Sequence, residues 1–560
     1  MRPPLAVSIS YCENFTLNNF PWWKETTIYQ IYPRSFFDSN DDGIGDLPGI
    51  IEKLDYIKEM GFETIWLSPH YQSPQRDFGY DISDYYQIAP EYGTVDDALK
   101  LIKETHSRGM KIIFDMILNH TSDEHAWFQE SRSSQENPKR DWYIWKDGKG
   151  KKPPNNWACL PGGSGWSYDK TTEQWYFHNF LDFQPDLNFR NPEVKQAMFD
   201  TIRYWLDQGV DGYRLDIFHS IYKDEQFRDN PFSWKYVPNA DFDEGYLQKL
   251  EYNLNRPETF ELAKEVRSLI DEYSPHRFVV GEVFGQGVVK KYLGENLDGL
   301  NLILLFDLIH LHKFKARDIC NILDYYEREY PHPYLPTLSL GNHDRRRYMS
   351  RIGEDKNRAR LLAVLQYTAR GVPITYYGDE LGIPDGEFSH RGALDAAAHP
   401  YWWLPARVAK WLKLYINRDG CRTPMQWNSE PNAGFSQTAE PWLPVHGKYP
   451  DCNVLRQMSE PQSLLRTHQD LLRIRKTHSV LRRGSLNLLT EGIPEDVVAY
   501  ERNSKDSSML IFMNFSNKEK RIELSEQYQG YSPVYDLNGA TQTEASLRIP
   551  AEGAILLAKT

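Results

Sequence analysis

The sequence lacks the features of secreted disulfide-rich, zinc-binding, membrane-spanning and nucleic-acid-binding proteins. Its 5 cysteines are scattered, odd in number and without C-x-x-C spacing, so we expect neither a disulfide framework nor a zinc site. No apolar run approaches the ~18 residues of a membrane span, and the first twenty residues do not read as a signal peptide. A net charge of -13 argues against a nucleic-acid partner, because phosphate contacts require basic patches. We therefore expect a soluble, cytoplasmic protein with no membrane or nucleic-acid partner.

Length and aromatic content are what the sequence has in abundance. A chain of 560 residues exceeds one simple domain and suits a large barrel with additions. Aromatic residues make up 14% of it, with 16 Trp and 35 Tyr. Such rings stack on the apolar faces of sugars but also fill cores, so their number is compatible with both uses.

The segment 209–219 combines a buried-strand pattern with two charges. Its apolar residues recur at every second or third position, which favours a short strand, although periodicity alone leaves a helix open. Arg214 and Asp216 are two residues apart and therefore share one face of such a strand. Pairing would satisfy both buried charges and keep the Asp ionised. The alternative is a purely structural ion pair; the carboxylates that recur at the ends of later predicted strands favour a chemical role.

Strand-like and helix-like segments alternate along most of the chain. We predict strands at 27–32, 64–67, 111–120, 209–219, 277–284, 300–308, 338–344 and 372–379, with helices that include 50–60, 191–208 and 463–477. This alternation predicts parallel βαβ units, and eight of them make an α/β fold, the (β/α)8 or TIM barrel. Polar residues cluster after the strands, where barrel enzymes place their active sites.

The remaining segments predict additions to this barrel. Residues 21–120 and 191–480 would form the barrel, after an N-terminal extension at 1–20. Residues 121–190 lose periodicity and are too long for a structureless loop, which predicts an inserted subdomain B after strand 3. Two further loop-rich stretches occupy 220–256 and 381–442. Short strands in 481–560 predict a C-terminal antiparallel β-sandwich domain.

Three segments carry a resemblance to a known family. Gly212-Tyr-Arg-Leu-Asp216 resembles the nucleophile strand of the α-amylase superfamily of retaining glycoside hydrolases. Gln184-Pro-Asp-Leu-Asn188 and Arg422-Thr-Pro-Met-Gln-Trp427 resemble segments of its α-glucosidase and oligo-1,6-glucosidase branch. The resemblance extends from Trp22 to the end of the chain.

The resemblance implies a retaining mechanism with three carboxylates. In such enzymes two carboxyl groups lie ~5–5.5 Å apart, so that one attacks the anomeric carbon directly. Asp216 would be the nucleophile, kept anionic by Arg214, and Glu282 the general acid and then base, with apolar neighbours that favour its protonated form. Asp344 would grip the 2- and 3-hydroxyls and stabilise the oxocarbenium-like state.

The resemblance also implies which residues bind the sugar. Asp77 would bind the non-reducing-end glucose with Tyr80 stacked beneath it, and Arg422 would contact the same glucose. His120, supported by Asp115, and His343 would donate hydrogen bonds to sugar hydroxyls. The implied substrate-binding set is Asp77, Tyr80, His120, Arg214, His343 and Arg422.

An acidic, glycine-containing loop at 38–46 predicts a structural cation. Its oxygen ligands would be the side chains of Asp38, Asn40, Asp42 and Asp46 and the carbonyl of Ile44. The twelfth position is Gly49 rather than Glu, so the loop is not an EF-hand. A solvated acidic turn is the alternative. Related α-glucosidases carry a similar loop as a Ca²⁺ or Mg²⁺ site; no organic cofactor is expected.

These observations predict an exo-acting α-glucosidase that releases glucose from short α-glucosides, as a monomer or homodimer. Ile217 follows the nucleophile; among related enzymes Val here accompanies α-1,6 and Ala or Thr α-1,4 linkages, so Ile leans weakly to α-1,6. An α-glucosyl transferase or a sucrose or trehalulose isomerase on the same scaffold is the alternative. A non-catalytic subunit like the transporter heavy chains of similar fold is disfavoured, because the three carboxylates are present and no membrane span is found.

Overall fold

The computed structural model describes residues 20–235, 244–285, 287–311, 313–411, 414–528 and 530–559. The predicted N-terminal extension at 1–20 therefore lies outside the described residues except for Phe20. Within the described ranges, no helix has both the length and the apolar character needed to cross a membrane.

Eight parallel strands form the central sheet, in the spatial order β13-β12-β9-β5-β2-β1-β15-β14. In chain order they are β1 (Ile28–Ile31), β2 (Thr64–Leu67), β5 (Lys111–Met116), β9 (Gly212–Leu215), β12 (Phe278–Gly281), β13 (Leu302–Ile303), β14 (Thr337–Ser339) and β15 (Val372–Tyr376). All are buried on both faces, as a parallel sheet covered by helices requires. The predicted barrel is confirmed.

A side chain completes the barrel between β13 and β14. No ladder pairing joins these two described strands. Instead the Thr337 hydroxyl donates to the Ile303 carbonyl at 2.9 Å and accepts from the Leu305 amide at 2.9 Å. The predicted strand at 300–308 is therefore only two residues long, since the chain leaves the ladder where Thr337 takes over its hydrogen bonds.

Helices surround the barrel. The main ones are α1 (Leu47–Glu52), α2 (Leu54–Met60), α3 (Val95–Ser107), α5 (Pro192–Asp207), α6 (Pro257–Asp271), α7 (Ala316–Glu329), α9 (Lys356–Thr368) and α12 (Leu464–Thr477). Of these, α1, α3, α5, α9 and α12 begin at side chains that cap their first amides, whereas α2, α6 and α7 have no side-chain cap. Thr94 and Asp97 form a reciprocal capping box on α3, and Asn191 caps α5 just before Pro192. The helix predicted at 50–60 is two helices, α1 and α2, which meet at Lys53.

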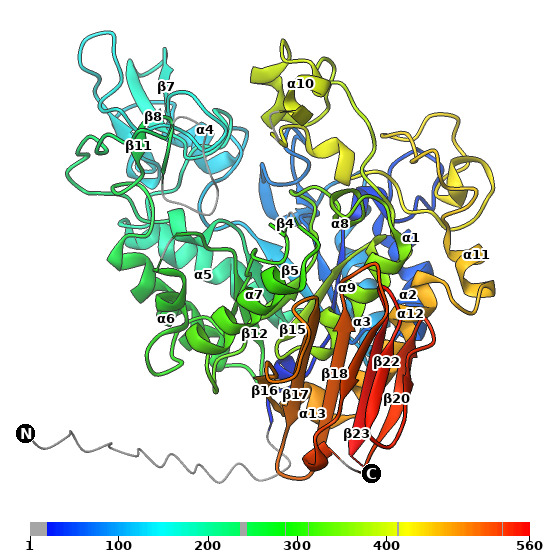
Figure 1. Ribbon diagram of the computed structural model, residues 1–560. Helices are drawn as coiled ribbons and strands as arrows, with labels where there is room; N and C mark the ends of the chain where they lie inside the picture. The colour runs from blue at the N-terminus through cyan, green and yellow to red at the C-terminus, as the bar shows by residue number, and fades with distance from the viewer. Residues whose placement is uncertain are drawn as a thin grey trace, which may run out of the picture.

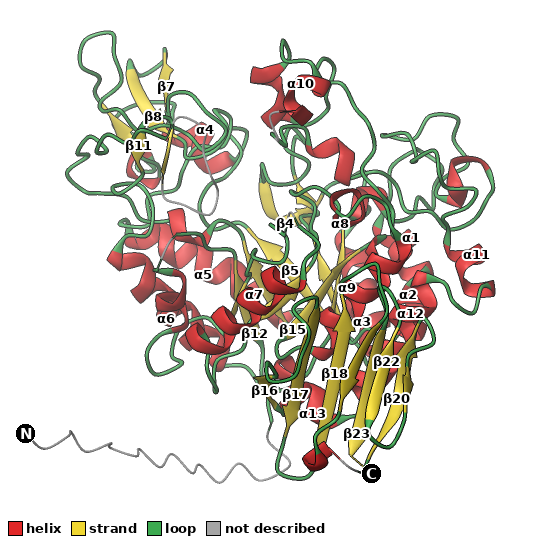
Figure 2. Cartoon of the chain, in the orientation of Figure 1, coloured by secondary structure: helices red, strands yellow, loops and turns green. Residues whose placement is uncertain are grey.

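Irregular segments rise above the carboxyl ends of the strands (Figure 2). Residues 121–190 contain α4 (Ala126–Ser131) and an antiparallel sheet of β6 (Trp145–Lys146), β8 (Gln174–Phe177) and β7 (Trp166–Asp169). This sheet packs its own core around Trp157, Trp166 and Phe177. The stretch after β9 carries the short pair β10 (Glu244–Gly245) and β11 (Gln248–Lys249), and the stretch after β15 carries α10 (Ala406–Trp411).

The C-terminal residues form two antiparallel sheets against the barrel (Figure 1). One has the order β16-β17-β18-β23-β20 and the other β19-β22-β21. Their bounds are β16 (Ser485–Leu488), β17 (Val497–Asn503), β18 (Ser508–Asn514), β19 (Lys520–Glu523), β20 (Tyr531–Leu537), β21 (Thr541–Gln542), β22 (Ser546–Ile549) and β23 (Ala554–Lys559). Side chains from both sheets share one apolar core, which includes Leu510, Leu547 and Leu557. This is the sandwich that the alternating pattern predicts.

Candidate active site

Sheet register brings three carboxylates and an arginine together at one end of the barrel. Asp115 of β5 pairs in register with Arg214 of β9, and Leu215 of β9 pairs with Gly281 of β12. The next residues along β9 and β12 are Asp216 and Glu282, which therefore leave the sheet side by side. Gly212 permits this approach, because a Cβ at its positive φ would clash with the carbonyl oxygen of Phe278 on β12.

Arg214 is the centre of this cluster. Its side chain is 1% exposed, and Nη1 contacts Asp115 Oδ1 at 2.7 Å and Asp216 Oδ1 at 2.6 Å. Its Nη2 forms an ion pair with Glu282. The predicted pairing of Arg214 with Asp216 is confirmed, and both predicted catalytic carboxyl groups contact the same guanidinium group.

Three carboxyl groups around one guanidinium exceed the negative charge that it can neutralise. Burial raises the pKa of Asp216 well above its usual range; Arg214 opposes this, while Glu282 and Asp115 add to it. Burial likewise raises the pKa of Asp115 to about 6 against the effect of Arg214. The expectation that Arg214 alone keeps Asp216 ionised therefore omitted the other two carboxylates. The two neighbouring carboxylates therefore favour the protonated form of Asp216, against the effect of Arg214.

Asp344 lies in a second cluster that has the opposite electrostatic balance. Its carboxylate contacts Nε2 of His343 at 3.0 Å and one guanidinium nitrogen each of Arg418 and Arg422 at 3.1 Å. Burial would raise the pKa of Asp344, but His343 and the two arginines outweigh it and hold the pKa well below its usual range. Asp344 is therefore a fixed anion, and its side chain, 26% exposed, is the most open of the three acids.

His343 has its hydrogen placed by its neighbours. Nε2 of Gln30, which can only donate, lies 2.7 Å from Nδ1 of His343, so the neutral ring carries its hydrogen on Nε2. That nitrogen lies 2.5 Å from the Tyr80 hydroxyl, and the two rings stack with an interplanar angle of 4°. Burial lowers the pKa of His343 to about 3, so the ring is neutral at physiological pH. The ring of His343 is therefore oriented with Nε2 as a hydrogen-bond donor.

Arg418 is the functional candidate that sequence reasoning missed. From the 3-10 helix η8 (Arg418–Cys421), its guanidinium contacts Asp77 at 2.7 Å, Asp344 at 3.1 Å and Asp395 at 2.7 Å. Arg422, which is expected to contact the same glucose as Asp77, contacts Asp344 and donates to the His343 carbonyl at 2.9 Å. The contact of Arg422 with the sugar stays a prediction. Both arginines belong to the sequence run 417–427, and nothing in their spacing distinguishes which of them meets Asp77.

His120 lies among the expected residues but uses both ring nitrogens within the protein. Nε2 lies 3.1 Å from the Tyr80 carbonyl and Nδ1 lies 3.3 Å from Nδ2 of Asn119. Burial lowers the pKa of His120 to about 4. In this arrangement His120 holds the backbone of Tyr80 in place; donation to a sugar hydroxyl stays a prediction.

Ile217 adopts a backbone conformation that β-branched residues rarely take. Its φ of 31° and ψ of 42° lie in the left-handed region. The amide of the next residue, Phe218, donates to the Glu282 carbonyl at 3.0 Å, and the Glu282 amide donates to the Leu215 carbonyl at 2.8 Å. These bonds hold the nucleophile turn against the strand end that bears Glu282, and they fix the strained residue beside both acids.

The acidic loop folds around its own amides. Asp38 accepts from the amides of Asn40, Asp41 and Gly43, and Asp46 accepts from Gly49 as the N-cap of α1. Within the described residues no group of three His, Cys, Asp or Glu side chains is arranged to hold a metal ion. As they stand, the side chains of Asp38, Asn40, Asp42 and Asp46 fit self-capping turns better than a ready-made cation cage, and the cation stays a prediction.

Comparison with protein families agrees with this geometry. Residues 30–484 match the family described as alpha amylase, catalytic domain, and residues 497–552 match the alpha-amylase SusG C-terminal domain.

Individual relatives extend over almost the whole chain. An oligo-1,6-glucosidase of Parageobacillus thermoglucosidasius is 38% identical, covering 90% of this chain and 92% of the relative. An alpha-glucosidase of Schizosaccharomyces pombe is 36% identical, covering 92% and 94%. Among solved structures, the alpha-glucosyl transfer enzyme XgtA superposes with a TM-score of 0.88 at 36% identity, covering 97% of this chain and 100% of that one.

Proposed function

Because the chain belongs to the α-amylase family of glycoside hydrolases, we propose that it is an exo-acting α-glucosidase. It releases the terminal non-reducing glucose of short α-linked saccharides with retention of configuration. The observation that carries this proposal is the position of Arg418, which joins Asp77 to Asp344. We infer that such a bridge closes the site beyond one sugar and offers charged partners to the hydroxyls of a terminal glucose.

The reaction proceeds in two steps at the Arg214 cluster. Asp216 attacks the anomeric carbon while Glu282, as general acid, gives a proton to the leaving oxygen, which forms a glucosyl ester and frees the aglycone. Glu282 then takes a proton from water, the water oxygen attacks the anomeric carbon, and the ester bond breaks to regenerate Asp216. Asp344 and His343 bind the ring hydroxyls and stabilise the developing positive charge.

Two measurements test this assignment. Proton NMR early in maltose or isomaltose hydrolysis should show α-glucose as the first product; β-glucose first, or release of internal oligomers, would contradict it. Glu282→Gln should lose most activity on disaccharides but retain much more on p-nitrophenyl α-glucoside, because that leaving group departs without protonation. Asp216→Asn should lose both activities. If Glu282→Gln were equally inactive on both substrates, Glu282 would not be the general acid.

Transfer of glucose to a sugar acceptor is a second candidate activity. The solved structures similar to this chain include an alpha-glucosyl transfer enzyme and the trehalulose synthase MutB, the latter at 32% identity and a TM-score of 0.87. The covalent intermediate is common to hydrolysis and transfer, which differ in whether water or a sugar attacks it. Incubation with concentrated sucrose or maltose distinguishes them: new linkages in excess of free glucose would favour the transferase.

Linkage preference is proposed to lean to α-1,6. The relatives named oligo-1,6-glucosidase and the bulk of Ile217 beside the nucleophile support this preference. A panel of maltose, isomaltose, sucrose, trehalose and nigerose measures it. We expect Ile217→Thr to raise the ratio of maltose to isomaltose hydrolysis several-fold. An unchanged ratio would show that Ile217 does not determine the linkage preference.

Three further properties are proposed. Four described cysteines, Cys159, Cys320, Cys421 and Cys452, are free, which supports a reducing, cytoplasmic location that cell fractionation can test.

A structural Ca²⁺ or Mg²⁺ at Asp38, Asn40, Asp42, Ile44 and Asp46 would raise the melting temperature when the ion is titrated into the chelator-treated protein. Asp42→Asn would abolish that rise. Light scattering on the purified chain decides between monomer and homodimer.

A further inference from the structure

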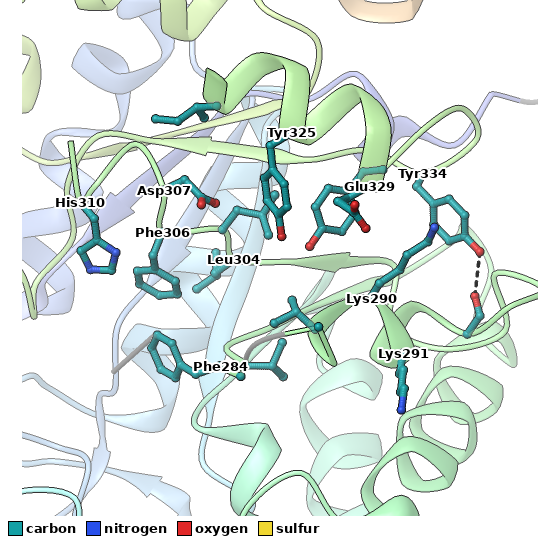
Figure 3. A pocket seen from close by; sticks show the side chains of 18 of the residues that line it. Phe284, Lys290, Lys291, Leu304, Phe306, Asp307, His310, Tyr325, Glu329 and Tyr334 are labelled. Carbon is teal, nitrogen blue, oxygen red and sulfur yellow. Dashed lines mark hydrogen bonds between the residues drawn. The ribbon is translucent and has the colours of Figure 1, made fainter. Parts of the chain in front are cut away.

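A cavity of about 800 Å³ lies on the flank of the barrel beside the active site. It opens between the segments that follow β12 and β13 and the helix α7 (Figure 3). None of the arginine–carboxylate residues described above is among the described residues that line it. The lining begins, however, at Val283 and Phe284, directly after Glu282.

The cavity exists because the described chain between β12 and β13 forms too little secondary structure to fill this space. Between β12 and β13 the described residues form only the 3-10 helix η5 (Val289–Leu293). The neighbouring crossings before β9 and β12 carry α5 and α6, of 16 and 15 residues. A five-residue helix leaves the face of α7 that bears Tyr325 and Glu329 partly uncovered. The volume falls within the range typical of ligand sites, roughly 300–1,000 Å³.

Aromatic rings face this space from opposite walls. Phe284 and Phe306 lie with centroids 4.8 Å apart on one side, and Tyr325 extends from α7 with 37% of its surface exposed. Tyr334 lies at the other end, its hydroxyl donating to the Gly294 carbonyl at 3.0 Å and its ring beneath the Lys290 ammonium. The C–H faces of pyranose rings pack on aromatic surfaces of this kind, which also hold other flat apolar ligands.

The charges around the rings select among those ligands. The lining includes the carboxylates of Glu295, Asp307 and Glu329 and the ammonium groups of Lys290 and Lys291, so it is nearly balanced in charge. Such a lining disfavours both a phosphorylated ligand, which the carboxylates repel, and a purely apolar one, which would leave the charges desolvated. A neutral ligand with many hydroxyl groups satisfies the carboxylates and rings together.

We propose that this cavity is a second, non-catalytic saccharide site, which holds a short neutral α-glucoside beside the loop of Glu282. The proposal rests on the proposed function for the identity of the sugar, since a glucosidase meets α-glucosides at high concentration. Asp307 and Glu329 accept from the sugar hydroxyls, while Tyr325 and Phe284 cover its two faces (Figure 3).

Calorimetric titration of the Asp216→Asn enzyme with maltotriose tests the proposal, because this variant binds sugar without consuming it. We expect two molecules bound per chain. Adding Tyr325→Ala together with Glu329→Gln should weaken the second binding event about tenfold or more and leave the first unchanged. Tyr168→Ala, which removes a ring 48% exposed on β7, is the matched control and should retain both events. One molecule per chain in the Asp216→Asn parent, or two events unchanged by Tyr325→Ala with Glu329→Gln, would overturn the proposal.

A second readout separates this inference from the proposed function. Saturation-transfer NMR of maltotriose, with an iminosugar saturating the catalytic site, should still show bound sugar in the parent enzyme and none in the Tyr325→Ala, Glu329→Gln variant. If the wild-type enzyme hydrolyses maltose but this signal is missing, the second site fails alone. If the wild-type enzyme hydrolyses no α-glucoside, the proposed function fails, whatever the cavity binds.

Discussion

Buried arginines serve the two ends of this molecule in opposite ways. At the catalytic end, Arg214 and Arg418 each contact three carboxylates, and burial, which lowers their pKa values, is outweighed by those anions. Where the barrel meets the C-terminal sandwich, Arg475 of α12 and Arg502 of β17 contact only backbone carbonyls. Burial lowers the pKa of both junction arginines.

The difference shows how one residue type performs chemistry or joins domains. Arg502 donates to the carbonyls of Thr368, Leu481, Gly484 and Ser485, which belong to the end of α9 and to the chain entering the sandwich. The guanidinium of Arg502 satisfies helix and turn carbonyls, and because it is buried its charge is out of reach of a ligand. The catalytic arginines instead each contact three carboxylates, which carry more negative charge than one guanidinium neutralises. These carboxylates remain available to react with a substrate.

The largest expected effect is at the catalytic end. Asp216→Asn removes the nucleophile while keeping its shape and one acceptor for Arg214, so kcat should fall by about 10⁴-fold or more with little change in melting temperature. Steady-state kinetics and thermal unfolding measure the two quantities. Retention of more than a few per cent of activity would show that Asp216 is a structural partner of Arg214, like the arginines of the junction.

Removing a junction arginine should do the reverse. Arg502→Met removes a donor from four carbonyls of the junction, of which that of Leu481 keeps a second donor in Arg475, so the free energy of unfolding should fall by about 3–5 kcal/mol. The kcat per folded molecule should stay unchanged. Urea unfolding measures this, with Arg473→Met as control, because the side chain of Arg473 is 72% exposed on the same helix as Arg475. A loss equal to that of the control would mean that the junction does not depend on Arg502.

Two lysine substitutions sharpen the comparison within the catalytic end. Arg418→Lys replaces a fork that reaches three carboxylates with a point charge, so kcat/KM should fall by about 10²-fold. Arg422→Lys, which affects one carboxylate and one carbonyl, should cost about tenfold. Kinetics on maltose and isomaltose compare them. A larger loss for Arg422 would show that Arg422, rather than Arg418, is the main arginine partner of the terminal glucose.

The pH dependence of stability should also arise at the catalytic end. Burial raises the pKa of Asp379, which follows β15, to about 7 against the effect of Arg347. The folded state therefore binds more protons than the unfolded state between about pH 4 and 7. The contribution of Asp379 to stability is present below about pH 4 and is lost as the pH rises through 7.

Asp379→Asn removes this titration. Between pH 5 and 7.5 the wild-type protein should lose about 2 kcal/mol more stability than the variant, as measured by urea unfolding at both pH values. Asp324→Asn is the control, since that side chain is 66% exposed. If the wild type and Asp379→Asn lost equal amounts of unfolding free energy between these pH values, the pH dependence would not arise from Asp379.

Much of the fold followed from local pattern. Periodicity located the eight barrel strands and the sandwich, although strand ends were too long because a two-residue strand such as β13 is completed by Thr337 from another part of the chain. The three acids were also foreseeable, because each lies in the last part of a predicted strand. Ile217 was noted for its bulk, but its left-handed backbone depends on the bonds between its turn and Glu282.

The sequence by itself determined which strands form, which acids end them and to which family they belong, because these depend on neighbours in the chain. Only the tertiary structure decided that Arg418 rather than Arg422 meets Asp77, since those partners are 341 residues apart. It also decided that three carboxylates share Arg214 and that a cavity opens beside α7. Such features arise where separate segments converge, and the energies of burial and charge pairing that fix them depend on all the segments at once.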